Sequence, residues 1–348
     1  MPQAIKTPLV AAGPGQPNSS LGAEAAQTAP RHANGADISR AVAAILPVLQ
    51  EKPASPGVWA ALKRAGASFV KVPRQSRYAA IGMTIYAIFI LIAIFADQIA
   101  PYPPLEILFD DNYKLARNLP PGGDHWLGTT YGGRDVFSQL VISSRSALLV
   151  GLSAAVCVVA IGTLVGLLSG FFGGWVDNLL MRLADIALGI PFLPFVIVLA
   201  AFLGASQYNV ILGIALLLWP NSARVIRSQV MSLRERSFVE AARVTGASQM
   251  KILFVHIAPN ILSLSFLYTS VAVGWAILTE ASVSFLGFGP SNTVSWGYML
   301  QDAYASQALG RGQFYWFLPP GLCIVAIVTA GFFISRGYEE VLFPKLKA

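Results

Sequence analysis

The chain has 348 residues, of which 55% are hydrophobic and only 12% are charged. This number of charges is too small for the surface of a soluble protein of this length. The composition therefore excludes a soluble globular protein and indicates a membrane protein. The formal net charge of +7 would suit nucleic-acid binding, but the Lys and Arg residues lie beside apolar runs instead of on one continuous face. This distribution favours membrane topology over a nucleic-acid partner.

The N-terminal part is polar and low in aromatic residues. Residues 1–57 are rich in Pro, Ala, Gly, Ser and Gln, a composition that cannot bury a core, and we expect a disordered cytosolic tail. Residues 58–77 form a basic juxtamembrane segment, which places the N-terminus inside the cell. Its cations are Lys63, Arg64, Lys71, Arg74 and Arg77.

The first apolar block carries no charge from residue 78 to 96. A helix of about 19 residues, rising about 1.5 Å per residue, crosses the roughly 30 Å of hydrocarbon, so this block predicts the first transmembrane helix. Residues 97–146 follow with balanced acids and bases and several prolines, which favours an extracytoplasmic loop.

Residues 147–345 contain the remaining apolar blocks. The second predicted span, 147–172, has glycines at a spacing of four, which suits close helix packing. The uncharged stretch between Asp185 and Arg224 is long enough for two spans joined by an external turn near 204–209, with Pro191 and Pro194 kinking the first of them. The fifth and sixth spans are predicted at about 261–286 and 315–335.

Between these blocks lies a polar loop, residues 234–260, which predicts a short helix, a break and a second helix. Good helix formers surround Glu240, Gly246 supplies the stop, and Pro259 is expected to end the second helix. The loop is rich in Lys and Arg, which places it on the cytosolic side.

The sequence Glu240-Ala241-Ala242, followed by Gly246 and by His256-Ile-Ala-Pro259-Asn260, resembles the EAA loop of binding-protein-dependent ABC importer permeases, in the dipeptide, oligopeptide and nickel branch. Ala258 departs from that pattern, which usually has Leu. The resemblance implies an all-α polytopic protein of about six transmembrane helices with the type I importer permease fold. It also implies that the loop couples to an ATPase, through Glu240, Ala241, Ala242, Gly246, His256 and Pro259.

Two other segments are similar to the same branch, so the resemblance covers about residues 125–345. One is Leu127-Gly-Thr-Thr-Tyr-Gly-Gly-Arg-Asp135, in which Thr130, Tyr131 and Gly132 replace the usual two acids and Leu. The other is the closing segment from Phe332 to Pro344.

The resemblance implies a permease subunit of an ATP-driven importer of di- or oligopeptides in the cytoplasmic (inner) membrane, with both termini cytoplasmic. The implied partners are a second homologous permease subunit (a heterodimer), two cytosolic ATPase subunits, an extracytoplasmic substrate-binding protein and the lipid bilayer. Nickel or oligosaccharide importers share the motifs and remain alternatives. A secondary transporter or a structural membrane protein would leave the loop at 234–260 unexplained.

The sequence offers no catalytic chemistry. It has no Gly-Lys pair and so no Walker A loop, and we expect the chain to be no enzyme, with ATP and Mg²⁺ bound by the partner subunits. Cys157 and Cys323 have no paired spacing, and the three histidines are scattered, so we expect no metal site.

Charged residues inside apolar spans are candidate functional residues. Arg182 and Asp185 lie three apart on one helix face, and their pairing, or extension of Arg182 to the interface, is favoured over a substrate role. Glu280 has no evident sequence neighbour to pair with. It is expected to face another helix, the translocation path or the outer interface.

Overall fold

The computed structural model describes residues 72–109, 113–290 and 292–342. The predicted tail 1–57, most of the basic segment 58–77 and the last residues 343–348 lie outside them. Within the described residues the regular structure is helical, and strand pairing is limited to isolated bridges such as Phe109 with Leu115. The prediction of an all-α protein is therefore confirmed for this part of the chain.

Five described helical stretches are long and apolar enough to cross a membrane, and a bent pair makes a possible sixth, which confirms the predicted number of about six. The five are α4 (Arg77–Ile94), α6 (Val136–Phe172), α9 (Gln207–Arg234), the run Gln249–Phe285 that ends in α12 (Ala258–Phe285), and α14 (Phe314–Leu342). The bent pair is α7 (Gly174–Gly189) with α8 (Phe192–Leu203).

The bend between α7 and α8 lies where the sequence predicts a kink. The two helices meet at 84°. Ile190 is extended (ψ 126°), as expected for a residue that precedes proline, and Pro191 opens α8 with φ −59°. Pro194 falls in the first turn of α8, where a missing N–H costs no helical hydrogen bond. The prolines therefore break the third span instead of only bending it.

Helix α6 begins at Val136, inside the predicted loop 97–146 and before the predicted core boundary at 147. Asp135 caps this helix, because its carboxylate accepts the backbone N–H and the hydroxyl of Ser138, both at 2.7 Å. The first turns carry buried Ser138 and Gln139, so they lack the apolar signal of a span. The helix therefore begins before residue 147, from which hydropathy predicts the span, because the cap at Asp135 sets its start.

Three glycines of α6, Gly162, Gly166 and Gly170, pack directly against α9, and their spacing of four predicts such close helix packing. A Cβ atom added to Gly166 would lie 2.7 Å from the carbonyl oxygen of Ala223, and one added to Gly170 would lie 2.7 Å from that of Arg227. Larger side chains could not fit at these positions. Glycines four residues apart therefore allow the close distance between α6 and α9.

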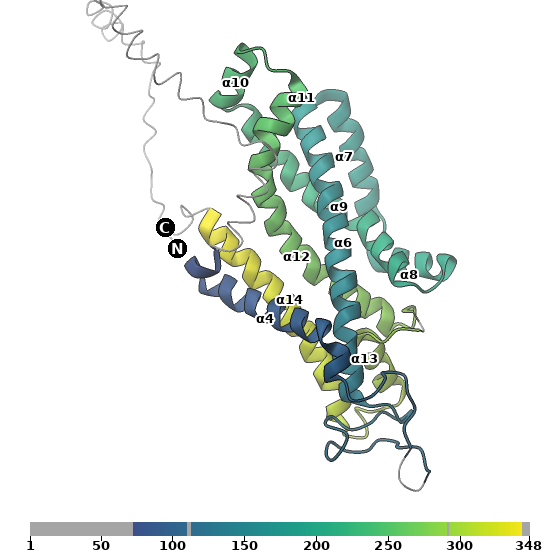
Figure 1. Cartoon of the computed structure of the whole chain (residues 1–348). Coiled ribbons are helices and arrows are strands. Elements are labelled where there is room, and N and C mark those ends of the chain that lie inside the picture. Colours follow the sequence, from purple (N-terminus) through teal and green to yellow (C-terminus); the bar gives the residue numbers. More distant parts are fainter. Residues whose placement is uncertain (1–71, 110–112, 291, 343–348) are drawn as a thin grey trace, which may run out of the picture. The chain divides into compact units, whose positions relative to one another are not determined.

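Helix α4 runs beside α14, and the end of α4 is fastened to α6 (Figure 1). Arg145 of α6 donates to the carbonyl oxygens of Ala93 (2.6 Å) and Ile94 (3.2 Å) and pairs with Asp97 at 2.8 Å. A cation at the C-terminus of α4 satisfies carbonyls that have no helical partner. Asp97 lies in the short helix α5 (Ala96–Ile99).

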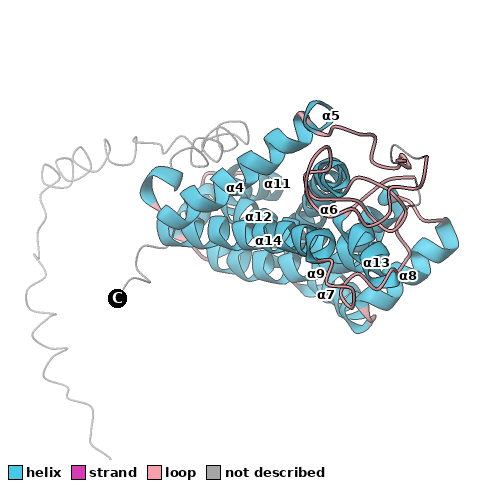
Figure 2. Ribbon diagram, turned by 90° about the horizontal axis from the view of Figure 1, so that it is seen from below, coloured by secondary structure: helices cyan, strands magenta, loops and turns pink. Residues whose placement is uncertain are grey.

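The two ends of the long helices differ. Figure 1 shows α10 (Ser237–Val244) and α11 (Gln249–Lys251) at one end and α13 (Trp296–Ala305) at the other. Figure 2 shows irregular chain gathered over the end that carries α6 and α13. A buried cluster that includes Trp296, Met299 and Trp316 joins α6, α12, α13 and α14 near this end.

Candidate functional site

The loop between α9 and α12, residues 234–260, begins with the amphipathic helix α10. Val239 and Ala242 on one face are buried, whereas Glu240 and Ala241 are exposed. Glu240 lies in the first turn, where a carboxylate interacts favourably with the helix dipole. Within the described residues Glu240 forms no ion pair, so its charge is presented to the surroundings.

Gly246 ends α10 in the way the sequence predicts. Its φ is +77°, and its N–H donates to Arg243 O while Ala247 N–H donates to Ala242 O, both at 3.0 Å. These two bonds form a Schellman motif, which requires a left-handed residue. Nothing lies within 4 Å of an added Cβ atom, so the glycine is needed for its backbone conformation and not for space.

The prediction that Pro259 ends the second helix is wrong. Helix α11 continues through a π-helical stretch, η1 (Ile252–Ile257), into α12, so the chain is helical from Gln249 to Phe285. The ring of an interior proline clashes with a preceding carbonyl in an α-helix, and the wider π-helical turn lies directly before Pro259. His256 is half-buried in η1, and its carbonyl oxygen accepts Asn260 Nδ2 at 2.6 Å.

Apolar contacts fasten the loop to three long helices. Val239 and Ala242 of α10 and Leu253 of η1 belong to one buried cluster. The other members come from η1, from the ends of α6 and α9, and from the start of α12: Leu167, Phe171, Ile226, Val230, Ile252, Ile257, Ala258 and Ile261. Helix α10 itself packs on η1, which in turn contacts α9 and continues into α12, so η1 links α10 to the long helices.

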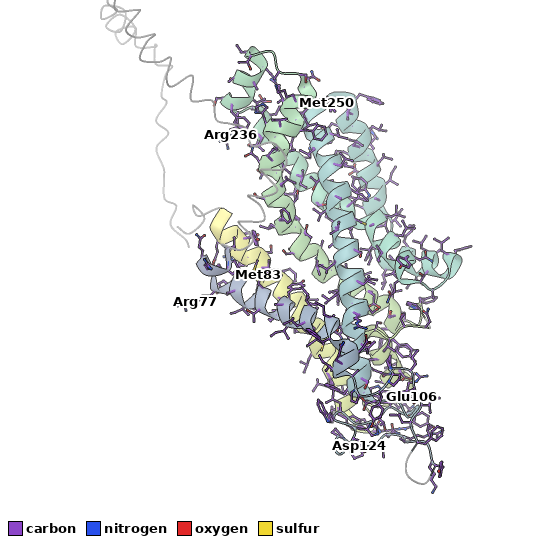
Figure 3. The ribbon with its side chains drawn as sticks, viewed as in Figure 1. Arg77, Met83, Glu106, Asp124, Arg236 and Met250 are labelled. Atoms are coloured by element: carbon purple, nitrogen blue, oxygen red, sulfur yellow. The ribbon has the colours of Figure 1, made fainter. Side chains whose placement is uncertain are left out.

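The outer side of the loop exposes apolar and basic side chains together. Val244 is 88% exposed and Met250 53% exposed. Arg236, Arg243 and Lys251 are also exposed. Figure 3 places Arg236 and Met250 at this end and Glu106 and Asp124 at the opposite end. Exposed apolar residues with a charged rim are typical of a surface that binds another protein.

The charges within the spans pair between helices. Asp185 pairs with Arg224 of α9 at 2.6 Å and not with Arg182, so the predicted Arg182–Asp185 pairing is wrong. Arg182 is exposed and forms no ion pair within the described residues. Asp177 accepts Arg227 Nε at 2.6 Å and the hydroxyl of Ser169, a link between α7, α9 and α6 that sequence reasoning missed.

Glu280 faces protein. Its side chain is 2% exposed, Ser284 donates to its Oε1 at 2.7 Å, and Ser295 also hydrogen-bonds the carboxylate. Within the described residues the carboxylate thus contacts its own helix and the segment that leads into α13, and a role at the translocation path stays a prediction. Ser284 lies four residues after Glu280 on the same helix, so this partner could have been found from the sequence.

At the opposite end, the Gly-Arg-Asp segment positions α6 and α13. Asp135 caps α6, and its Oδ1 also accepts a hydrogen bond from His125 Nδ1–H at 3.0 Å. Arg134 Nη1 donates to the hydroxyl of Tyr298 in α13 at 2.8 Å. Burial raises the pKa of Asp302, and the charge of Arg134 opposes that rise.

The described residues hold no group of three His, Cys, Asp or Glu side chains that could bind a metal ion. Residues 162–348 match the family described as binding-protein-dependent transport system inner membrane component. Residues 69–121 match the N-terminal transmembrane domain of oligopeptide transport permease C. The chain belongs to this family of ABC importer permeases.

Named relatives of this permease cover most of its length. It is 35% identical over 276 residues to the oligopeptide transport system permease protein OppC of Bacillus subtilis, and 34% identical over 276 residues to the dipeptide transport system permease protein DppC of Alkalihalophilus pseudofirmus. In each case 79% of this chain and 88% of the relative are covered. The glutathione transport system permease protein GsiD of Pectobacterium atrosepticum is 34% identical over 260 residues, covering 74% of this chain and 84% of the relative.

Proposed function

We propose that this permease is a subunit of an ATP-driven importer that carries di- or oligopeptides across the cytoplasmic membrane. The observation that carries the proposal is the construction of loop 234–260: an exposed helix, closed by Gly246, whose inner face packs on η1 and shares one buried apolar cluster with residues of α6, α9 and α12. The names of the relatives support a peptide substrate.

The proposed mechanism is mechanical coupling. A partner ATPase binds the exposed side of α10 near Glu240 and Val244, and its closure moves α10. Helix α10 packs on η1, and Val239 and Ala242 share one buried apolar cluster with η1 and with residues of α6, α9 and α12. Through η1 this movement displaces the long helices and switches the pore between inward-open and outward-open states. In this proposal Glu240, Ala241, Ala242, Gly246, His256 and Pro259 are coupling residues and no residue of the chain is catalytic.

The proposed assembly contains a second, homologous permease subunit, two cytosolic ATPase subunits and an extracytoplasmic substrate-binding protein. ATP and Mg²⁺ are bound by the ATPases, because this chain has no Gly-Lys pair and so no Walker A loop. Both termini and loop 234–260 are proposed to be cytoplasmic, and the cations Arg236, Arg243 and Lys251 support that orientation.

The test compares uptake of a radiolabelled tripeptide and peptide-stimulated ATP hydrolysis by the complete importer in proteoliposomes. Gly246→Asp and Glu240→Lys are the variants, and Arg182→Gln is the control that changes one exposed charge elsewhere. Losing a charged docking contact typically costs about 2–5 kcal/mol at an interface, so both activities should fall by at least tenfold. Peptide affinity of the binding protein and membrane insertion should stay unchanged.

The isolated permease subunit should hydrolyse no ATP. Tripeptide uptake at the parental rate by Gly246→Asp would contradict the coupling role of the loop. Uptake by the permease subunit without any ATPase would contradict the importer proposal as a whole.

A further inference from the structure

Two arginine side chains lie over one tyrosine ring at the end of the molecule that carries α13. The Cζ atom of Arg117 is 5.0 Å, and that of Arg311 5.3 Å, from the centroid of the Tyr131 ring. All three residues are exposed, Tyr131 by 41%. Among the described residues no carboxylate pairs with either arginine, so two positive charges are held together without a neutralising partner there.

The turn that carries Tyr131 is closed by several hydrogen bonds. Gly133 N–H donates to Thr130 O at 3.0 Å, and Arg134 N–H donates to the buried hydroxyl oxygen of Thr130 at 3.1 Å. The segment that carries Arg117 is bonded directly to this turn, because Asn118 N–H donates to Thr130 O at 3.1 Å. Tyr131 and Arg117 are therefore presented by one hydrogen-bonded unit.

Arg311 comes from a second ordered segment, the turns that follow α13. Gln307 has a φ of +54°, and Ala308 N–H donates to Ala303 O at 2.9 Å. Gln313 N–H donates to Ala308 O at 2.9 Å, and Arg311 N–H donates to Gln307 O at 3.2 Å. The backbone on both sides of the Tyr131 ring is thus defined before any partner binds, which lowers the entropic cost of binding.

The chemistry of the three side chains suits a carboxylate. Cation–π contact orients a guanidinium while leaving its N–H groups free to donate, and guanidinium binds carboxylate through two parallel hydrogen bonds. Tyr and Arg are also the residues that are most enriched at energetically dominant positions of protein interfaces.

We propose that Arg117, Tyr131 and Arg311 form a docking site for acidic side chains of the extracytoplasmic substrate-binding protein. This inference rests on the proposed importer function. It specifies where one of the partners binds and which charge its surface carries there.

The position of the site favours a soluble partner over a lipid headgroup. The exposed pair between Arg145 and Asp97 lies at the end of α4, where the apolar part of that helix stops. Helix α6 begins at Val136, nine residues before Arg145, so Val136 lies about 13 Å from Arg145 along the helix axis. The turn that carries Tyr131 precedes Val136 in the chain. Headgroup regions add only about 5–8 Å on each side of the hydrocarbon.

The test uses the complete importer in neutral-lipid nanodiscs and titrates it with its peptide-loaded binding protein, following ATP hydrolysis. In the double variant Arg117→Gln/Arg311→Gln, the half-saturating concentration of the binding protein should rise about tenfold or more, while the maximal rate stays unchanged. The dependence of that concentration on salt should also weaken. Hexaglutamate should compete with the binding protein on the parental importer, and hexaglutamine should not.

Two further variants test whether the effect depends on the two guanidinium groups themselves. Arg117→Lys/Arg311→Lys keeps both charges but loses the planar forks, so its half-saturating concentration should rise less than that of the Gln variant. Asp110→Asn/Asp111→Asn removes two acids that precede Arg117 in the sequence and should not raise the half-saturating concentration.

Several outcomes would overturn the inference. One is an unchanged half-saturating concentration in the Gln variant, and another is a fall in its maximal rate alone, which would indicate a structural role. A loss that appears only in vesicles containing anionic lipid would assign the arginines to the membrane. If the parental importer responds to its binding protein and the Gln variant responds equally, this inference alone fails; if the parent does not respond, the proposed function fails with it.

Discussion

The two ends of this permease are held together by different forces. Loop 234–260 is fastened by close-packed apolar side chains such as Val239 and Leu253 and exposes Val244 and Met250. The opposite end, around residues 113–135, is irregular chain held by directional hydrogen bonds: Asp135 accepts, Arg134 donates, and the hydroxyl of Thr129 does both. A packed helix can transmit displacement as a unit, whereas hydrogen-bonded turns fix the exact direction of a few side chains. The first arrangement suits force transmission and the second suits recognition.

The largest expected effect is all-or-none labelling, which tests whether these ends lie on opposite sides of the membrane. In a variant with Cys157 and Cys323 replaced by Ala, Asn292→Cys should react with an impermeant maleimide on intact spheroplasts. Ser248→Cys should react only after permeabilisation, because the cation-rich loop is proposed to be cytoplasmic. Reaction of Ser248→Cys from outside would reverse the orientation.

The next effect concerns stability at the hydrogen-bonded end. Asp135→Ala removes the cap of α6 and leaves His125 and Ser138 without their partner, which should lower the free energy of unfolding by about 2–4 kcal/mol. Thermal unfolding of the detergent-solubilised protein, followed with a thiol-reactive dye, measures this. Asp135→Asn keeps an acceptor oxygen and should lose less; an equal melting temperature in parent and Asp135→Ala would remove the proposed importance of the cap.

A smaller effect is expected for the exposed apolar residues of the loop. Val244→Ser should leave the melting temperature unchanged, because the side chain is 88% exposed. It should weaken binding of the permease complex to its ATPase subunits by about 1–2 kcal/mol, since the apolar area would be buried at that interface. Leu309→Ser, at the other end, is the matched control and should leave ATPase binding unchanged. Equal binding by Val244→Ser and the parent would argue that the ATPase contacts a different surface.

The smallest effect is a pH dependence at Asp302. Burial raises the pKa of Asp302 in the folded protein, so the folded state binds its proton more tightly than the unfolded chain. The free energy of unfolding should therefore fall as pH rises from the ordinary aspartate range through the raised folded pKa. Asp302→Asn should flatten this part of the pH profile of the melting temperature. A profile identical to that of the parent would show that Asp302 does not titrate differently in the folded state.

Local signals were enough for much of this molecule. Uncharged runs predicted about six spans, Pro191 predicted a kink at the place where the chain breaks between α7 and α8, and Gly246 predicted the end of α10. Each of these depends on a few consecutive residues, through helix length, proline stereochemistry or a left-handed backbone. The glycine spacing in α6 likewise predicted a packing face, although not that α9 would occupy it.

Tertiary structure decided what the residues contact. The sequence places Asp185 beside Arg182, but packing of α7 on α9 brings Arg224 to Asp185 and Arg227 to Asp177. It also decided that the chain passes through Pro259 as one helix and that Arg117 and Arg311 meet at Tyr131. Helix periodicity and turn chemistry act over a few residues and can be read locally. Contacts between side chains that are far apart in the sequence depend on how the helices pack. The spacing of neighbouring residues does not determine these contacts.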